Sequence, residues 1–295
     1  MNKKSLIGAI EAGGTKFVCA IGTDIDNIVT TTIPTTTPEE TLARVIDFFK
    51  NQPKAPEAFG IGSFGPIDNN QGSSAYGYIT DPPRSGWSRV NIVGEIQGAF
   101  KKPVAFETDV NMAALGEQTY GVARGHNSFV YLTVGTGIGG GVVERGELLE
   151  GILHPEIGHM LIPQDRDDSF KGSCRFHGNC LEGLASGSAI SKRWKIAGEE
   201  LPQGHSGWQL EAQYLACATV NLTTVLSPEL IILGGSVMLH PGLIAGVRLQ
   251  TKALLNDYLK LEQLGDKIDS YIVLPQHHNL SGVLGALESG RRLLE

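Results

Sequence analysis

The chain has few of the features that mark exported, membrane-spanning or nucleic-acid-binding proteins. Its 24 Lys and Arg are outnumbered by 31 Asp and Glu, so a net charge of −7 opposes binding to a phosphate backbone. The apolar run Leu6–Ile10 ends at Glu11, too early for an export signal, and glycines interrupt the uncharged stretch Asn127–Val143. We therefore expect a cytoplasmic protein that binds neither nucleic acid nor a membrane.

Cysteine is scarce too, with four residues in the chain, so metal ligands or buried thiols are expected rather than a disulfide framework. Glycine, in contrast, is abundant. It makes up 38 of the 295 residues, about 13% where roughly 7% is usual. The length favours two domains, and the glycines gather in segments where a backbone has to approach a ligand.

The first half reads as strands and helices in alternation. Two short apolar runs within residues 6–22 meet at Gly13-Gly14 and predict a β-hairpin. Thr37, Pro38 and Glu40 predict the capped start of a helix. Further elements are expected as a strand over 59–64, a helix over 92–100, a strand over 103–107 and a helix over 111–120. Asp109 then falls at a junction between a strand and a helix.

The second half opens in the same way as the first. A strand over 128–134, a glycine turn over 135–141 and a return strand at 142–143 repeat the hairpin, which indicates a duplicated domain. Helices follow near 188–197, 208–226, 241–259 and 283–294, with strands at 230–233 and 270–274. The pattern predicts an α/β fold with mixed sheets.

Both hairpins carry a threonine in their glycine turn, Gly13-Gly14-Thr15-Lys16 in the first and Gly135-Thr136-Gly137 in the second. Such turns offer unobstructed backbone N–H groups and a hydroxyl donor, which suit a polyphosphate. Neither has the spacing of a Walker loop. Either turn alone is also explained as a tight hairpin, whereas two at equivalent places favour a nucleotide held from both halves.

A metal centre is predicted in the irregular segment that follows. His159, Cys174, His177 and Cys180 have the spacing H-x14-C-x2-H-x2-C and offer four ligands suited to tetrahedral zinc. Because four protein ligands fill the coordination shell, the zinc is expected to be structural. The alternative is a pair of reduced cysteines beside a surface histidine.

The motifs together resemble those of the ROK family of sugar kinases and repressors, and within it they are similar to bacterial fructokinases. The resemblance rests on Glu11–Lys16, Ser63–Pro66, Glu107–Glu117, Gly135–Gly141 and Pro155–His159, with GAIEAGGTKFVCAIG (residues 8–22) and Tyr78–Pro83. It implies an actin-like ATPase fold, with two ribonuclease-H-like domains and a cleft between them. The smaller domain would span 1–118, completed by the helix 283–295, and the larger 119–282, with a zinc loop over 159–180.

The resemblance also implies roles for individual residues. Asp109 would be the general base, although an aspartate at a helix start is commonly an N-cap. Contacts to the sugar would come from Gly65, Thr108, Glu156, His159 and Glu182. Thr108 replaces the asparagine usual in the family. ATP would be held by Gly13, Gly14, Thr15, Gly135, Thr136, Gly137, Gly234 and Gly235, with Glu11 reaching Mg²⁺ and Lys16 meeting either a phosphate or solvent.

The activity implied is that of an ATP-dependent hexose kinase that makes fructose 6-phosphate from fructose, with Mg²⁺ and structural Zn²⁺ bound. Mannose, glucose and N-acetylmannosamine are alternative acceptors, since sequence does not place hydroxyl contacts. A sugar-sensing repressor is a second alternative, disfavoured because the first phosphate strand begins near Leu6 and the charge is acidic. A non-catalytic sugar- or ATP-binding protein is a third. A homodimer is implied by the family alone.

Overall fold

The computed structural model describes residues 5–82 and 84–295. Met1–Lys4 of the predicted first domain and Pro83 of the Tyr78–Pro83 motif lie outside the described residues. The chain divides into two compact units, one of Met1–Arg124 with Asn279–Glu295 and the other of Gly125–His278. The sequence placed these boundaries at 118/119 and 282/283. Among the described residues, no helix has the length and apolarity to cross a bilayer.

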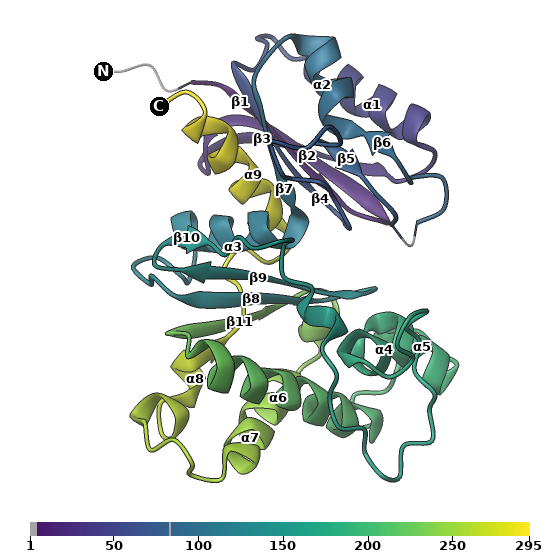
Figure 1. Ribbon diagram of the computed structural model, residues 1–295, viewed down its shortest axis with the longest axis vertical. Coiled ribbons are helices and arrows are strands. Elements are labelled where there is room, and N and C mark those ends of the chain that lie inside the picture. The colour runs from purple at the N-terminus through teal and green to yellow at the C-terminus, as the bar shows by residue number, and fades with distance from the viewer. Residues whose placement is uncertain (1–4, 83) are drawn as a thin grey trace. The chain divides into compact units, whose positions relative to one another are not determined.

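The first unit contains a five-stranded sheet in the order β3-β2-β1-β4-β7, with helices packed on it (Figure 1). The strands pair antiparallel from β3 to β1 and parallel from β1 to β7. Its elements are β1 (Ile7–Ala12), β2 (Lys16–Asp24), β3 (Asn27–Pro34), α1 (Pro38–Lys50), β4 (Ala58–Ser63), β5 (Tyr78–Ile79), β6 (Val90–Asn91), α2 (Ile92–Phe100), β7 (Val104–Thr108), α3 (Asp109–Tyr120) and α9 (Ser281–Arg292).

The second unit repeats this topology, with a sheet in the order β10-β9-β8-β11-β12. Its strands pair antiparallel from β10 to β8 and parallel from β8 to β12. Its strands and α-helices are β8 (Phe129–Val134), β9 (Ile138–Glu144), β10 (Glu147–Leu148), α4 (Leu181–Ala185), α5 (Gly187–Trp194), α6 (Gly207–Leu226), β11 (Leu230–Gly234), α7 (Leu243–Leu255), α8 (Ile268–Tyr271) and β12 (Ile272–Val273). Short 3-10 turns of this unit are η1 (Ile157–His159), η2 (Gly198–Glu200), η3 (Val237–Leu239) and η4 (Glu262–Leu264), and η5 (His278–Leu280) spans the boundary at which the chain returns to the first unit. The predicted duplication is confirmed.

The C-terminal helix α9 belongs to the first unit, where it packs on α3 and on the sheet (Figure 1). The contact is close because glycines line it: a Cβ built on Gly285 would lie 1.7 Å from the Met112 carbonyl oxygen. Glu117 is buried at the same contact and accepts a hydrogen bond of 2.6 Å from the Ser281 hydroxyl. Chain ends far apart in sequence thereby form one core.

Several local predictions are confirmed. Thr37 caps α1 by accepting a hydrogen bond from the Glu40 amide, although the Glu40 carboxylate accepts from the Thr36 hydroxyl and from Arg44. Helix α2 has the predicted bounds, and the hairpin of β1 and β2 turns at residues 13–15.

Other predictions were wrong. Ile138–Gly141 form the start of β9 rather than part of a turn, because their backbone pairs with β8. Residues 268–271 form α8, which leaves only Ile272–Val273 as a strand. Strand β3, largely exposed and rich in threonine, has no apolar alternation by which it could have been predicted.

Candidate active site

Three parallel strands of the first unit end side by side, and the predicted site residues follow their carboxyl ends. The register pairs Ala12 of β1 with Ser63 of β4, and Ser63 with Thr108 of β7. The segments that follow these strands therefore start at one edge of the sheet, and they contain Gly13, Gly65 and Asp109. The carboxyl ends of parallel strands are where α/β proteins commonly bind ligands.

Thr108 and Asp109 share the start of helix α3, and the structure separates their roles. Thr108 is the N-cap: its hydroxyl oxygen accepts a hydrogen bond of 3.1 Å from the Asn111 amide, and the residue is 4% exposed. The alternative of Asp109 as N-cap is therefore wrong. Asp109 is the first helical residue and is partly exposed, with its Oδ1 2.9 Å from the Val110 nitrogen. A threonine hydroxyl that accepts one bond still has a proton to donate.

Glu11, near the end of β1, is the carboxyl group of this site whose pKa is shifted most. Its pKa is raised from 4.5 to about 8, chiefly by burial and also by the nearby Asp109 carboxylate, whereas Lys16 and a hydrogen bond from the Val283 amide of α9 oppose the rise. The Glu11 Oε2 atom is buried and has no hydrogen-bond partner. A buried carboxylate oxygen without a partner, beside a second carboxylate, is a site suited to a cation.

The first glycine turn is tied to neighbouring backbone. The Gly13 amide donates to the Lys16 carbonyl at 3.0 Å, and the Thr35 hydroxyl donates to the Gly13 carbonyl at 2.7 Å. Thr15 and Lys16 are exposed, and a Cβ on Gly14 would meet nothing within 4 Å. The turn therefore has an open face, which a phosphate group can approach.

In the second unit the two predicted glycine segments lie together. Strands β8 and β11 run parallel, and the turn Gly135–Gly137 follows β8 as Gly235 follows β11. Gly235 has φ of +93°, and a Cβ there would lie 2.3 Å from the Val134 carbonyl oxygen, so glycine is required. The structure thus brings the five predicted nucleotide residues of this unit, Gly135, Thr136, Gly137, Gly234 and Gly235, to one edge of the sheet.

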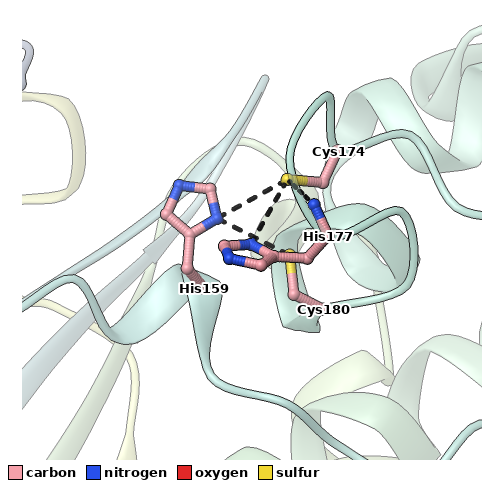
Figure 2. Close-up of side chains that lie close together, drawn as sticks. All are labelled: His159, Cys174, His177 and Cys180. Atoms are coloured by element: carbon pink, nitrogen blue, oxygen red, sulfur yellow. Dashed lines mark hydrogen bonds between the residues drawn. The ribbon is translucent and has the colours of Figure 1, made fainter.

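The predicted metal ligands are also brought together (Figure 2). His159 Nδ1 lies 3.7 Å from Cys174 Sγ and 3.6 Å from Cys180 Sγ, and Cys174 Sγ lies 3.8 Å from His177 Nδ1. The four ligand atoms lie within 4.8 Å of one another. Zinc bonds of about 2.0–2.3 Å separate neighbouring ligands of a tetrahedron by roughly 3.4–3.8 Å, so the donor set fits zinc.

Burial raises the pKa of Cys180 to about 11, with smaller contributions from Cys174 and Glu182. Without a metal this thiol keeps its proton at neutral pH, and metal binding has to displace that proton.

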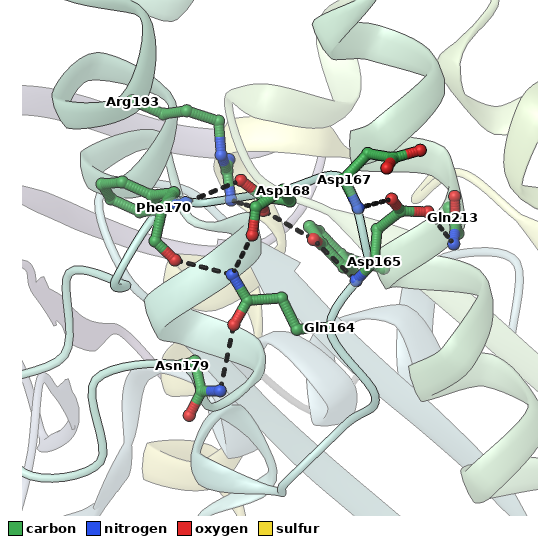
Figure 3. Close-up of polar contacts among 9 residues, drawn as sticks. Gln164, Asp165, Asp167, Asp168, Phe170, Asn179, Arg193 and Gln213 are labelled. Carbon is green, nitrogen blue, oxygen red and sulfur yellow. Dashed lines mark hydrogen bonds and ion pairs between the residues drawn. The ribbon is translucent and has the colours of Figure 1, made fainter.

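A network of polar contacts ties the same loop to helices α5 and α6 (Figure 3). Arg193 of α5 pairs with Asp168 at 3.1 Å, and the Tyr214 hydroxyl of α6 donates to the same carboxylate oxygen at 2.6 Å. Burial acts to raise the pKa of Asp168, but these bonds and one from the Phe170 amide hold it below its usual value. Gln164 Nε2 donates to the carbonyls of Asp168 and Phe170, which closes the segment into a compact turn.

The predicted sugar residues of this unit lie at both ends of the loop. Glu156 precedes η1 and is exposed, His159 ends η1, and Glu182 is the second residue of α4. Sequence reasoning missed His154, which is 9% exposed and lies with Nε2 3.1 Å from Glu156 Oε1. Its position directly before the Pro155–His159 motif was the available signal.

Sequence reasoning also missed how the second glycine turn is held. The Gly187 amide donates to the Gly135 carbonyl at 2.7 Å, and the Ser188 hydroxyl donates to the Thr136 carbonyl at 2.7 Å. Nothing in the spacing of residues 135 and 187 indicates this contact.

Comparison with known proteins shows the family to which the chain belongs. The ROK family model matches residues 7–289. The chain is 44% identical to the fructokinase of Lactococcus lactis subsp. cremoris over 94% of either chain. It is 43% identical to the fructokinase of Zymomonas mobilis, over 97% of this chain and 96% of the relative.

Among solved structures, a ROK glucokinase from Streptomyces griseus in complex with glucose and AMPPNP aligns with a TM-score of 0.77. The identity is 22%, over 97% of this chain and 99% of that one. The likeness confirms the predicted actin-like α/β fold.

Proposed function

Because the chain belongs to the ROK family, we infer that it is an ATP-dependent fructokinase, which converts D-fructose and ATP to D-fructose 6-phosphate and ADP. The observation that carries this conclusion is identity of 42–44% to several fructokinases along nearly the whole chain. The predicted activity, a phosphotransferase with an alcohol acceptor, is confirmed.

Asp109 is proposed as the general base. The fructose 6-hydroxyl oxygen forms a bond to the γ-phosphorus of ATP as the bond from phosphorus to the ADP oxygen breaks, and the hydroxyl proton passes to Asp109. Two observations support this role. Thr108 rather than Asp109 caps α3, and Asp109 stands at the strand edge beside Gly65 and Gly13.

The sugar contacts are proposed as Gly65, Thr108, Glu156, His159 and Glu182. Hydroxyl groups suit this set, since it combines carboxylate acceptors, a threonine hydroxyl and an imidazole. His159 turns Nδ1 toward the cysteine sulfurs, which leaves Nε2 to a sugar hydroxyl.

The ATP phosphates are assigned to the turns Gly13–Lys16 and Gly135–Gly137, with Gly234 and Gly235. Glu11 would hold the Mg²⁺ that accompanies ATP, because its Oε2 atom is buried without a hydrogen-bond partner. Bound there, Mg²⁺ neutralises developing charge on the phosphates. Lys16 is exposed beside the same turn and is assigned to a phosphate.

Structural Zn²⁺ is proposed at His159, Cys174, His177 and Cys180. The proposal is supported by the short distances between their nitrogen and sulfur atoms. Bound zinc fixes the His159 ring and the loop 159–180. We further propose two ribonuclease-H-like domains, a homodimer and a cytoplasmic site of action. The acidic charge supports the absence of nucleic acid as a partner.

The test is a panel of fructose, mannose, glucose and N-acetylmannosamine with MgATP, with ADP release as the readout and the phosphorylated position of the product read by NMR. We expect the highest kcat/KM with fructose and phosphate on its 6-oxygen. A higher value for another hexose would reassign the substrate, and no ADP release with any sugar would favour a regulator or binding protein.

A further inference from the structure

Glu182, which family resemblance assigns to the sugar, is bonded in this structure to the second glycine turn. Its Oε2 accepts a hydrogen bond of 3.0 Å from the Ile138 amide. A Cβ built on Gly137 would lie 2.6 Å from the same oxygen. The carboxylate therefore packs against the turn, in space that the missing Gly137 side chain leaves open.

This bond orients the peptide unit between Gly137 and Ile138, while the Gly187 amide and the Ser188 hydroxyl hold the carbonyls of Gly135 and Thr136. The peptide unit between Gly137 and Ile138 is planar, so its N–H and C=O point in opposite directions. With the N–H held by Glu182, the Gly137 carbonyl faces back across the turn and accepts a hydrogen bond of 2.9 Å from the Gly135 amide. Loss of the carboxylate would free this peptide plane to rotate and would release the bond that closes the turn.

Backbone hydrogen bonds hold the segment that carries Glu182. Helix α4 begins immediately after Cys180, and the Leu181 amide donates to the Met160 carbonyl at 2.9 Å. The Ser186 amide donates back to the Glu182 carbonyl at 3.1 Å. Glu182 is thus anchored on both sides along the backbone, and its side chain connects the segment that follows the metal cluster to Gly135–Gly137.

We propose that Glu182 is a positioning residue for the nucleotide, which acts by holding the turn Gly135–Gly137 in its phosphate-binding conformation. The inference rests on the proposed function, in which this turn binds the ATP phosphates. The two possible roles of Glu182 have different consequences. Replacement of a residue that contacts only the sugar changes the affinity for fructose. Replacement of a residue that shapes the turn changes the affinity for the nucleotide even when no sugar is present.

The experiment measures the Kd of MgADP by calorimetry in the absence of sugar, for the wild-type chain, Glu182→Ala and Glu182→Gln. A control, Glu199→Ala, removes an exposed carboxylate of the same unit. We expect Glu182→Ala to weaken MgADP binding at least tenfold, since a hydrogen bond to a charged group is lost. Glu182→Gln should stay within threefold of the wild type, because its amide oxygen accepts the same bond. Zinc content is measured for each variant, so that metal loss is distinguished from a turn effect.

A second variant, Gly137→Ala, tests the contact without removing Glu182. Residue 137 does not have a left-handed φ, so the new methyl group strains only the Glu182 carboxylate. We expect Gly137→Ala to weaken MgADP binding as Glu182→Ala does. If both variants bind MgADP like the wild type, and only the fructose KM rises in Glu182→Ala, the positioning role is overturned. If MgADP binding depends on Glu182 while no sugar is phosphorylated, the proposed function fails and the positioning role stands.

Discussion

Replacement of Glu11 by glutamine should make the first unit more stable, and increasingly so as the pH rises. Burial and the neighbouring Asp109 raise the pKa of Glu11 from 4.5 to about 8. The folded chain therefore holds a proton that the unfolded chain releases above pH 4.5, and the wild type loses stability as the pH rises from 4.5 to 8. Glutamine resembles the protonated carboxyl group and has no such loss.

The size of the effect follows from the two pKa values. One pKa unit corresponds to about 1.4 kcal/mol, so between pH 6 and pH 9 the advantage of Glu11→Gln should grow by roughly 2–3 kcal/mol. Urea unfolding is the assay, without metal or nucleotide. A background of Trp194→Phe and Trp208→Phe leaves the buried Trp87 as the reporter of the first unit.

The matched control is Glu39→Gln, which changes an exposed carboxylate on α1 and should show no pH-dependent difference. If the difference in unfolding free energy between Glu11→Gln and the wild type stays constant from pH 6 to pH 9, the electrostatic account of this site is wrong.

Three further predictions follow from the site and the core. Elemental analysis should find about one zinc per chain, and zinc binding at pH 7 should release at least one proton, because burial raises the pKa of Cys180 to about 11; a zinc-free preparation that unfolds at the same temperature as the untreated protein would refute the structural role. Thr108→Asn should change the order of preference among hexoses without loss of stability, since asparagine is also a good N-cap; an unchanged order would show that residue 108 does not set specificity. Gly285→Ala should destabilise the first unit by about 1–3 kcal/mol in urea unfolding, because its Cβ would lie 1.7 Å from the Met112 carbonyl oxygen; a change below about 0.5 kcal/mol would contradict the close packing of α3 and α9.

Most of the fold could be predicted from local patterns in the sequence. The Thr37-Pro38 cap and the apolar spacing of α1 were sufficient because each depends on neighbouring residues alone. The duplicated hairpins were visible for the same reason, since turn glycines and β-branched runs repeat in both halves. The cluster of His159, Cys174, His177 and Cys180 was predicted from its spacing in the sequence.

The sequence did not reveal features that depend on distant contacts. The family resemblance assigns Glu182 to the sugar, and only the packing of α4 against β9 shows that its carboxylate accepts a hydrogen bond from the Ile138 amide. His154 and Glu156 are two residues apart, yet their hydrogen bond depends on the irregular course of the chain before η1. Strand β3 was missed because it pairs at the sheet edge with threonines, and its burial is slight.

The most direct test of the account is fructose-dependent ADP release by the wild-type chain and by Asp109→Asn, at saturating MgATP. We expect turnover with the wild type and a kcat at least about a hundredfold lower in the variant, the usual contribution of a general base, with circular dichroism unchanged. Near-normal turnover in Asp109→Asn would contradict the central claim that this carboxylate, at the edge shared by β1, β4 and β7, takes the proton from the sugar.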